Sequence, residues 1–150
     1  MTRPSRPQAD PVAPSGSIDP PLPGTRCPPG PPTDRAALGR WGEDLAARYL
    51  SEAGLVLVER NWHCRHGEVD IVARDGDCLV ICEVKTRRTR RFGEPVEAVR
   101  HDKVLRLRRL ATAYLAERRP GLPLVRIDVI GVLVPLGGPP EIRHVRGVGS

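Results

Sequence analysis

The chain has 150 residues and carries 24 Lys and Arg against 18 Asp and Glu, a formal net charge of +6 at pH 7. This length allows one domain and hardly two, and the excess of positive charge favours a polyanionic partner such as nucleic acid. No apolar run is long enough to span a bilayer, and the N-terminus lacks the apolar stretch of a secretory signal peptide. We therefore expect a cytoplasmic protein with no membrane partner.

Proline dominates the first 32 residues, which hold eleven of the 17 prolines and few large apolar side chains. Such a segment cannot bury enough apolar surface to offset the entropy lost on ordering. We predict that residues 1–32 form a disordered, proline-rich tail and that residues 33–150 form a single domain. Aromatic residues are scarce, so the core of that domain must consist mainly of Leu, Val, Ile and Ala.

A first helix is predicted from Thr33 or Asp34, either of which can cap it, to about Ala53, where Gly54 is typical of a helix C-terminus. Its apolar residues recur at helical spacing. They are Leu38, Trp41, Leu45, Ala46 and Tyr49. Glu43 lies at the edge of this stripe, and two interpretations stay open for it. It is either a solvated residue or a carboxylate that joins a site on the neighbouring sheet.

Three strands are predicted next, at residues 55–62, 69–74 and 78–86. The pair Asp75-Gly76 favours a two-residue hairpin turn between the second and third strands. With these two residues at the centre of the turn, Asp70 faces Ile81. By the same register Glu68 faces Glu83. Trp62 closes the first strand, and we expect it to fill the core or an edge of the sheet rather than to stack on bases.

Side chains alternate along a strand, so Glu68, Asp70, Glu83 and Lys85 are expected on one face of the hairpin. Three neighbouring carboxylates repel one another, and a bound Mg²⁺ or Mn²⁺ would relieve the repulsion because hard cations prefer oxygen ligands. Lys85 could then orient or deprotonate a water, or offset charge on a phosphate. The alternative is a solvated surface on which these residues only form ion pairs. Apolar neighbours on the same face favour a partly buried site; they are Val72, Leu79 and Ile81.

A basic run follows the third strand, with five positive charges among the seven residues 85–91. Its four arginines are expected to hold a phosphate backbone next to the acidic site. They are Arg87, Arg88, Arg90 and Arg91. The alternative is a solvated, mobile loop. A second helix is predicted from residue 96 or 101 to residue 118, with Lys103 on a basic flank that can also face a polyanion.

The C-terminal part of the chain predicts a strand at residues 124–134 and a short edge strand at residues 141–145. Arg126 and Asp128 share a face of the first of these strands and are expected to form a structural ion pair. The four cysteines are expected to be reduced thiols. No zinc site is expected either, because the chain has no C-x-x-C pair.

The order of these elements, with Asp70 on the second strand and Glu83-Val84-Lys85 on the third, resembles the core of the PD-(D/E)xK nucleases. The chain resembles more closely the YraN-like family of uncharacterised bacterial proteins, which is similar in fold to restriction endonucleases and archaeal Holliday-junction resolvases. The matching segments are Gly42-Glu43, residues 60–62, residues 67–70, residues 83–87, Phe92-Gly93, Lys103 and residues 126–128. Val69 stands where the nuclease motif has proline, which supplies no chemistry.

This resemblance implies an α/β fold with a restriction-endonuclease-like three-layer core, in which helices pack on a mixed sheet of about five strands. It implies that Asp70 and Glu83 are metal ligands and that Lys85 is the catalytic lysine. Glu43 is a further candidate ligand, as in the resolvase-like branch, and Glu68 is another. Because junctions present two equivalent strands, resolvase-like enzymes are commonly dimers, so a homodimer is an open expectation.

We therefore expect a Mg²⁺- or Mn²⁺-dependent nuclease that hydrolyses phosphodiester bonds in DNA, including branched DNA. Two alternatives stay open, because a fold does not fix a function. One is a nucleic-acid-binding domain that retains the nuclease fold without turnover. The other is a scaffold domain in which Glu83 and Lys85 form ion pairs only.

Overall fold

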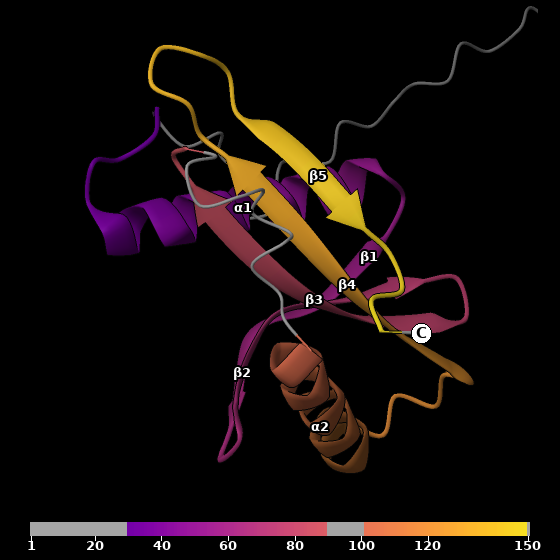
Figure 1. Ribbon diagram of the computed structural model, residues 1–150. Coiled ribbons are helices and arrows are strands. Elements are labelled where there is room, and N and C mark those ends of the chain that lie inside the picture. Colours follow the sequence, from indigo (N-terminus) through magenta and orange to yellow (C-terminus); the bar gives the residue numbers. More distant parts are fainter. Residues whose placement is uncertain (1–29, 90–100, 150) are drawn as a thin grey trace, which may run out of the picture.

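In the computed structural model, residues 30–89 and 101–149 are described. They form a five-stranded mixed sheet with one helix on each of its faces, as Figure 1 shows. The three-layer α/β architecture expected from the sequence is therefore confirmed. Of the predicted tail, only residues 30–32 are described, and Arg90, Arg91 and the alternative helix start at residue 96 lie outside the described residues. No helix in the described ranges has the length and apolar character needed to cross a membrane.

The elements lie close to their predicted positions. They are α1 (Arg35–Glu52), β1 (Val56–Cys64), β2 (Gly67–Asp75), β3 (Cys78–Arg87), α2 (His101–Arg118), β4 (Leu124–Leu133) and β5 (Glu141–Val145). The strands follow the order β1-β2-β3-β4-β5 in the sheet, where β3 and β4 are parallel and the other neighbours are antiparallel. The parallel pair needs a crossover, and this crossover contains α2.

Helix α1 begins and ends as its sequence predicts. The side chain of Asp34 accepts a hydrogen bond from the Ala37 amide at 2.9 Å, and Gly54 adopts a φ of +94° just after the helix. Gly42 faces β3 so closely that a Cβ atom there would lie 1.9 Å from Thr86 Oγ1. Only glycine allows this approach, and it brings the next residue, Glu43, close to the end of β3.

Two apolar cores lie on opposite faces of the sheet. The core under α1 contains Leu38, Trp41, Ala46, Ala47, Leu50, Leu55, Ile71, Ala73, Val80, Cys82, Val84, Ile130, Val132 and Val134. The core under α2 contains Trp62, Val69, Val72, Leu79, Ile81, Leu107, Leu110, Ala111, Tyr114 and Ile127. Trp62 is 3% exposed and packs edge-to-face on Tyr114, so its predicted place in the core is confirmed. Cys64, Cys78 and Cys82 are free thiols.

The register of the β2–β3 hairpin differs from the predicted one. Val72, not Asp70, is paired with Ile81, and Asp75 is paired with Cys78. The turn is therefore centred on residues 76 and 77. Its first central residue, Gly76, has a φ of +60°, and a type II′ turn gives this position to glycine. The prediction placed Asp75 and Gly76 at the centre of the turn, a position that an Asp-Gly pair also fits. It was wrong because Gly76 takes the first central position and Asp77 takes the second.

A slip of two residues leaves every side chain of a regular strand on its original face, and the predicted faces hold for β3. Leu79 and Ile81 pack under α2, whereas Val80 and Cys82 pack under α1, so Glu83 is on the side of the sheet that was expected. Strand β2 departs from strict alternation, because Val69 and Val72 both pack under α2.

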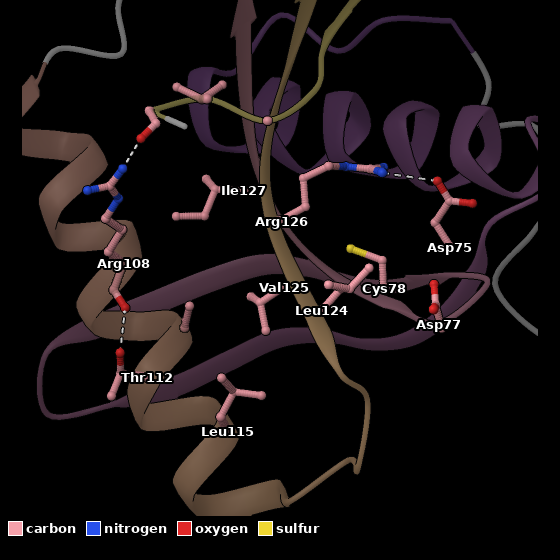
Figure 2. Close-up of a pocket in the computed structure, with 14 residues that line it drawn as sticks. Asp75, Asp77, Cys78, Arg108, Thr112, Leu115, Leu124, Val125, Arg126 and Ile127 are labelled. Carbon is pink, nitrogen blue, oxygen red and sulfur yellow. Dashed lines mark hydrogen bonds and ion pairs between the residues drawn. The ribbon is translucent and has the colours of Figure 1, made fainter.

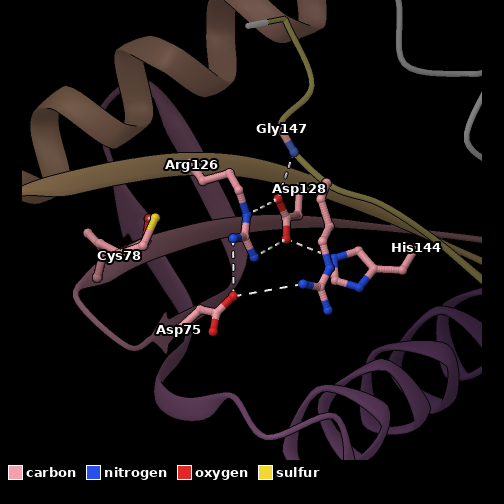
Figure 3. Close-up of polar contacts among 8 residues, drawn as sticks. Asp75, Cys78, Arg126, Asp128, His144 and Gly147 are labelled. Carbon is pink, nitrogen blue, oxygen red and sulfur yellow. Dashed lines mark hydrogen bonds and ion pairs between the residues drawn. The ribbon is translucent and has the colours of Figure 1, made fainter.

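The middle of β4 is tied to β5 and the C-terminal segment by the buried carboxylate of Asp128, shown in Figure 3. Arg126 Nε donates to Asp128 Oδ1 at 2.8 Å, so the predicted ion pair is confirmed. Asp128 also lies 2.7 Å from His144 Nε2 and accepts from the Gly147 amide at 3.0 Å, while Arg126 reaches Asp75 at 3.1 Å. Burial alone would raise the pKa of Asp128, but these hydrogen bonds outweigh burial and lower it.

Candidate active site

The candidate site lies where β2 and β3 separate. Their ladder runs from the pair Asp75–Cys78 to the pair Ile71–Cys82. Beyond it β2 continues beside β1, and β3 continues beside β4. At this fork the Val84 amide donates to Asp70 Oδ2 at 2.8 Å. The Asp70 side chain thus satisfies a backbone donor that the β2–β3 ladder no longer reaches, and this bond fixes the carboxylate at the fork.

The fork opens into a cavity of about 290 Å³ to which two strands and both helices contribute. It is lined by Glu43 from α1, Glu68 and Asp70 from β2, Glu83, Val84 and Lys85 from β3, and Arg106 from α2. Asp70 is 7% exposed and Glu83 is 5% exposed. Two carboxylates are therefore almost completely removed from water, which is unfavourable unless cations or hydrogen-bond donors compensate.

Glu83 has cationic partners on two elements. Lys85 Nζ lies 3.2 Å from Glu83 Oε1, and an Arg106 guanidinium nitrogen lies 3.7 Å from the same oxygen. Lys85 reaches Glu83 along one face of β3, because residues two apart on a strand point the same way. Arg106 reaches it from α2. The two cations hold the Glu83 side chain on the α2 side of the fork.

Asp70 lacks such compensation. Burial raises the pKa of Asp70 to about 7, with a further contribution from the negative charge of Glu83 and only a partial offset from the Val84 amide. Burial likewise raises the pKa of Glu43, and Glu68 and Glu83 add to the rise. The acidic residues of the cavity thus repel one another through low-dielectric surroundings. A cation placed among them would lower the pKa of each.

The donor set fits a hard divalent cation. The acidic side chains that line the cavity offer carboxylate oxygens. Mg²⁺ takes one or two protein carboxylates, with waters and phosphate oxygens completing its octahedron. Among the described residues, no three His, Cys, Asp or Glu side chains already converge as metal ligands. One oxygen of each of the two buried carboxylates already has a partner, because Asp70 Oδ2 accepts from the Val84 amide and Glu83 Oε1 faces Lys85. Asp70 and Glu83 would hold the ion, and Glu43 and Glu68 could reach it from the sides.

The structure brings together all four predicted acidic residues and Lys85, but with different exposure. Glu43 is half-buried. Glu68 lies at the rim, where its side chain is 58% exposed and 3.5 Å from His63 Nδ1. Lys103 lies beside Lys85, whose charge, together with partial burial, lowers the pKa of Lys103. The predicted nucleic-acid residue Lys103 is therefore a neighbour of the predicted catalytic lysine.

The predicted basic run is only partly described. Arg87 ends β3, where its carbonyl accepts from the Val134 amide at 2.7 Å. The Arg88 guanidinium donates to the carbonyl of Pro32. Neither residue lines the cavity.

Arg106 lines the cavity although the sequence did not single it out as a site residue. One signal could have found it. Arg106 follows Lys103 by three residues, so both lie on one side of α2 within a single helical turn. What the sequence could not give is the packing of α2 across the fork.

A larger cavity of about 850 Å³ lies between α2, β4 and the C-terminal segment, and Figure 2 shows it. It is lined mostly by apolar side chains. Its two arginines have partners already, since Arg126 contacts Asp75 and Asp128, and Arg108 donates to the carbonyl of Gly149. This cavity is larger than the one at the fork but lacks its buried, uncompensated carboxylate.

Comparisons with other proteins show which chains are similar in sequence. Residues 42–132, which include every residue lining the fork, match the uncharacterised protein family UPF0102. A UPF0102 protein of Streptomyces griseus is 61% identical over 116 residues, covering 76% of this chain and 97% of that protein. A UPF0102 protein of Kineococcus radiotolerans is 54% identical over 114 residues, covering 75% of this chain and 93% of that protein. These names state no activity.

Proposed function

The chain belongs to the uncharacterised protein family UPF0102, the YraN-like family expected from its motifs, and we propose that it is a Mg²⁺-dependent nuclease. The substrate would be DNA, including branched DNA or repair intermediates, and the reaction would be hydrolysis of a phosphodiester bond. One observation carries the proposal. Asp70 and Glu83 are buried side by side in a cavity that also holds Lys85.

In this proposal Asp70 and Glu83 bind Mg²⁺ or Mn²⁺, and Glu43 and Glu68 support them. The bound ion would supply a positive charge that polarises a phosphoryl oxygen and lowers the pKa of a water. The Val84 amide keeps Asp70 oriented toward the fork. Burial of both ligands strengthens their electrostatic interaction with any cation and its substrate.

Lys85 is proposed as the catalytic lysine. Its ammonium lies 3.2 Å from Glu83 Oε1, so it would offset negative charge that develops on a phosphate bound at the fork. Arg106 and Lys103 stand next to it on α2. These cations would attract the scissile phosphodiester and hold it, and Arg87, Arg88, Arg90 and Arg91 would hold phosphates further along the DNA.

The proposal is tested by incubating the full chain with linear, flapped and four-way DNA in Mg²⁺ or Mn²⁺. We expect cleavage of at least one substrate and none in EDTA. In Asp70→Asn, Glu83→Gln and Lys85→Met the cleavage rate should fall at least about 100-fold, because general acid–base and electrostatic groups contribute factors of this size. Arg143→Gln, an exposed substitution on β5, is the matched control and should keep the wild-type rate.

Two results would contradict the proposal. One is the absence of metal-dependent cleavage on every substrate of the panel, with RNA versions of the same structures included. The other is cleavage at the wild-type rate by Asp70→Asn or Glu83→Gln. Circular dichroism of each variant separates a lost reaction from a lost fold.

A second candidate function is a nucleic-acid-binding domain without turnover. It is favoured by the ion pairs of Glu83 with Lys85 and Arg106, which already neutralise one of the two buried carboxylates. This function predicts salt-dependent DNA binding that survives Asp70→Asn and Glu83→Gln, together with no cleavage of any substrate.

The proposal includes a cytoplasmic location, where chromosomal DNA and Mg²⁺ are both accessible. It also includes a homodimer, as expected for an enzyme that cuts two equivalent strands of a junction. Light scattering of the purified full chain, with and without four-way DNA, measures the oligomeric state.

A further inference from the structure

A groove runs between α2 and the tip of the β1–β2 hairpin, which lie side by side in Figure 1. Its volume is about 670 Å³. The hairpin contributes Cys64, Arg65 and His66, and α2 contributes Arg109, Thr112, Ala113, Ala116 and Glu117. None of these residues takes part in the proposed cleavage site.

This groove lies next to the cavity at the fork. Gly67 connects them along the chain, because His66 before it lines the groove and Glu68 after it lines the cavity. A Cβ on Gly67 would lie 4.0 Å from an Arg106 guanidinium nitrogen. Arg106 lines the cavity, and Arg109 lines the groove one helical turn later, about 4.5 Å along the helix axis. The two hollows therefore lie next to each other along α2.

The charges that line the groove suit a polyanion. Arg65 and Arg109 are exposed, and Arg65 Nε donates to His66 Nε2 at 3.3 Å. The acidic residue of the lining, Glu117, is 3.6 Å from an Arg118 guanidinium nitrogen, so its charge is partly offset. With Lys103 and Arg106 these arginines extend the positive charge of α2 from the fork to the hairpin.

The floor of the groove is made of small side chains. The nearby rings of Trp62 and Tyr114 are 3% and 1% exposed and pack on each other with ring centroids 5.2 Å apart, so bases cannot stack on them. The described aromatic ring in the lining is the imidazole of His66, which already accepts a hydrogen bond from Arg65. Recognition would rest on phosphate contacts, which position a nucleic acid without reading its sequence.

We propose that this groove binds the DNA strand that continues from the scissile phosphate, with Arg109 and Arg65 contacting its phosphates. The inference rests on the proposed nuclease function and adds a path for the substrate. From the fork the strand passes Arg106 and Gly67 and then follows the groove between α2 and the β1–β2 hairpin. Binding along this path is independent of base sequence.

The test is the affinity of the full chain for fluorescein-labelled DNA, single-stranded and duplex, in EDTA at several salt concentrations. In the double variant Arg65→Gln/Arg109→Gln, affinity should fall about tenfold or more at moderate salt. The slope of log affinity against log salt should become shallower by about 1.8 for duplex or about 1.4 for a single strand. Arg40→Gln/Arg143→Gln, on α1 and β5, removes the same charge elsewhere and should change affinity far less.

A second measurement uses the thiols of the chain. Cys64 lines the groove, whereas Cys78 lines the 850 Å³ cavity on the other side of α2. Bound DNA should slow the alkylation of Cys64 and leave that of Cys78 unchanged, with peptide mass spectrometry measuring each rate. This comparison uses the wild-type chain and does not depend on any variant folding.

The outcomes separate the two proposals. If the wild type binds DNA but Arg65→Gln/Arg109→Gln keeps its affinity and salt slope, and Cys64 is not protected, the groove is not the path and the nuclease proposal stands. If Arg40→Gln/Arg143→Gln loses as much affinity for DNA as Arg65→Gln/Arg109→Gln, the groove proposal is also overturned. If the wild type binds neither DNA form, the groove proposal is overturned, whereas the nuclease proposal is decided separately by the cleavage panel with Mg²⁺ or Mn²⁺.

Discussion

Asp70 is held in an environment that disfavours its charge. It is 7% exposed, and burial and the Glu83 charge raise its pKa from 3.8 to about 7. The sequence identified this residue because an aspartate two residues into an alternating strand faces the same side as Glu-x-Lys on the next strand. It could not give the burial, which depends on both helices packing over the fork. Such strongly shifted groups concentrate at functional sites.

The shifted pKa predicts an effect on stability. The folded pKa exceeds the unfolded value of about 3.9, so the folded state retains a proton that the unfolded state has released. Stability is therefore lost as pH rises from about 4 to about 7, and the loss is complete above pH 7. A rise of this size corresponds to at most about 4 kcal/mol at 1.36 kcal/mol per pKa unit.

Asp70→Asn should consequently be more stable than the wild type in EDTA at pH 8, by about 1–2 kcal/mol, because asparagine is neutral and its Oδ1 can still accept from the Val84 amide. The difference should shrink as the pH falls toward 4. Urea unfolding at several pH values measures it. Equal stability of the two proteins at every pH would show that the Asp70 carboxylate is not destabilised in the fold.

At the scale of elements, the site depends on how closely α1 approaches β3. Gly42 permits that approach, and Glu43 follows it in the chain. The sequence predicted the helix and its ends from Asp34 and Gly54. It left open whether Glu43 reaches the site, since periodicity places a residue on a helix face but not against a particular strand.

Gly42→Ala should destabilise the protein by about 1–3 kcal/mol, as overpacking does, because its Cβ would lie 1.9 Å from Thr86 Oγ1. Gly39→Ala on the same helix is the matched control. A Cβ there meets nothing within 4 Å, so alanine should stabilise the helix by about 0.5–1 kcal/mol. Urea unfolding of both variants decides between these signs. Destabilisation by both, or by neither, would rule out close packing at Gly42 as the cause.

The hairpin shows which part of an element is encoded locally. Alternation of side chains predicted the faces of β3 correctly, whereas β2 interrupts the alternation, because Val69 and Val72 both pack under α2. The register depended on which residue begins the turn, and the Asp-Gly pair was compatible with two choices. The structure places Gly76 first, with a φ of +60°. Asp70 lies beyond the β2–β3 ladder and accepts from the Val84 amide through its side chain, so the candidate site does not depend on the predicted register.

At the scale of the whole molecule, four separated segments meet at the fork. Glu43, Asp70 and Glu83 come from α1, β2 and β3, and Arg106 comes from α2 after the crossover. Local patterns predicted Asp70 and Glu83 together, because they lie on neighbouring strands, but left open whether Glu43 on the adjoining helix joins them. The place of Arg106 follows only from the crossover that lays α2 over the opposite face of the sheet. For the same reason the groove between α2 and the hairpin could not be predicted from sequence.

Cation binding at the fork is the step on which cleavage depends, and the free energy of unfolding as a function of Mg²⁺ concentration at pH 8 measures it most directly. A ligand that binds only the folded state stabilises it by about 2.7 kcal/mol at 100 times its dissociation constant. We predict that in EDTA the wild-type protein is less stable than Asp70→Asn. As Mg²⁺ is added, the wild type should gain stability, whereas Asp70→Asn should gain little. A wild-type protein that gains no stability from Mg²⁺ or Mn²⁺, or an Asp70→Asn variant that gains as much, would contradict a cation site at the fork.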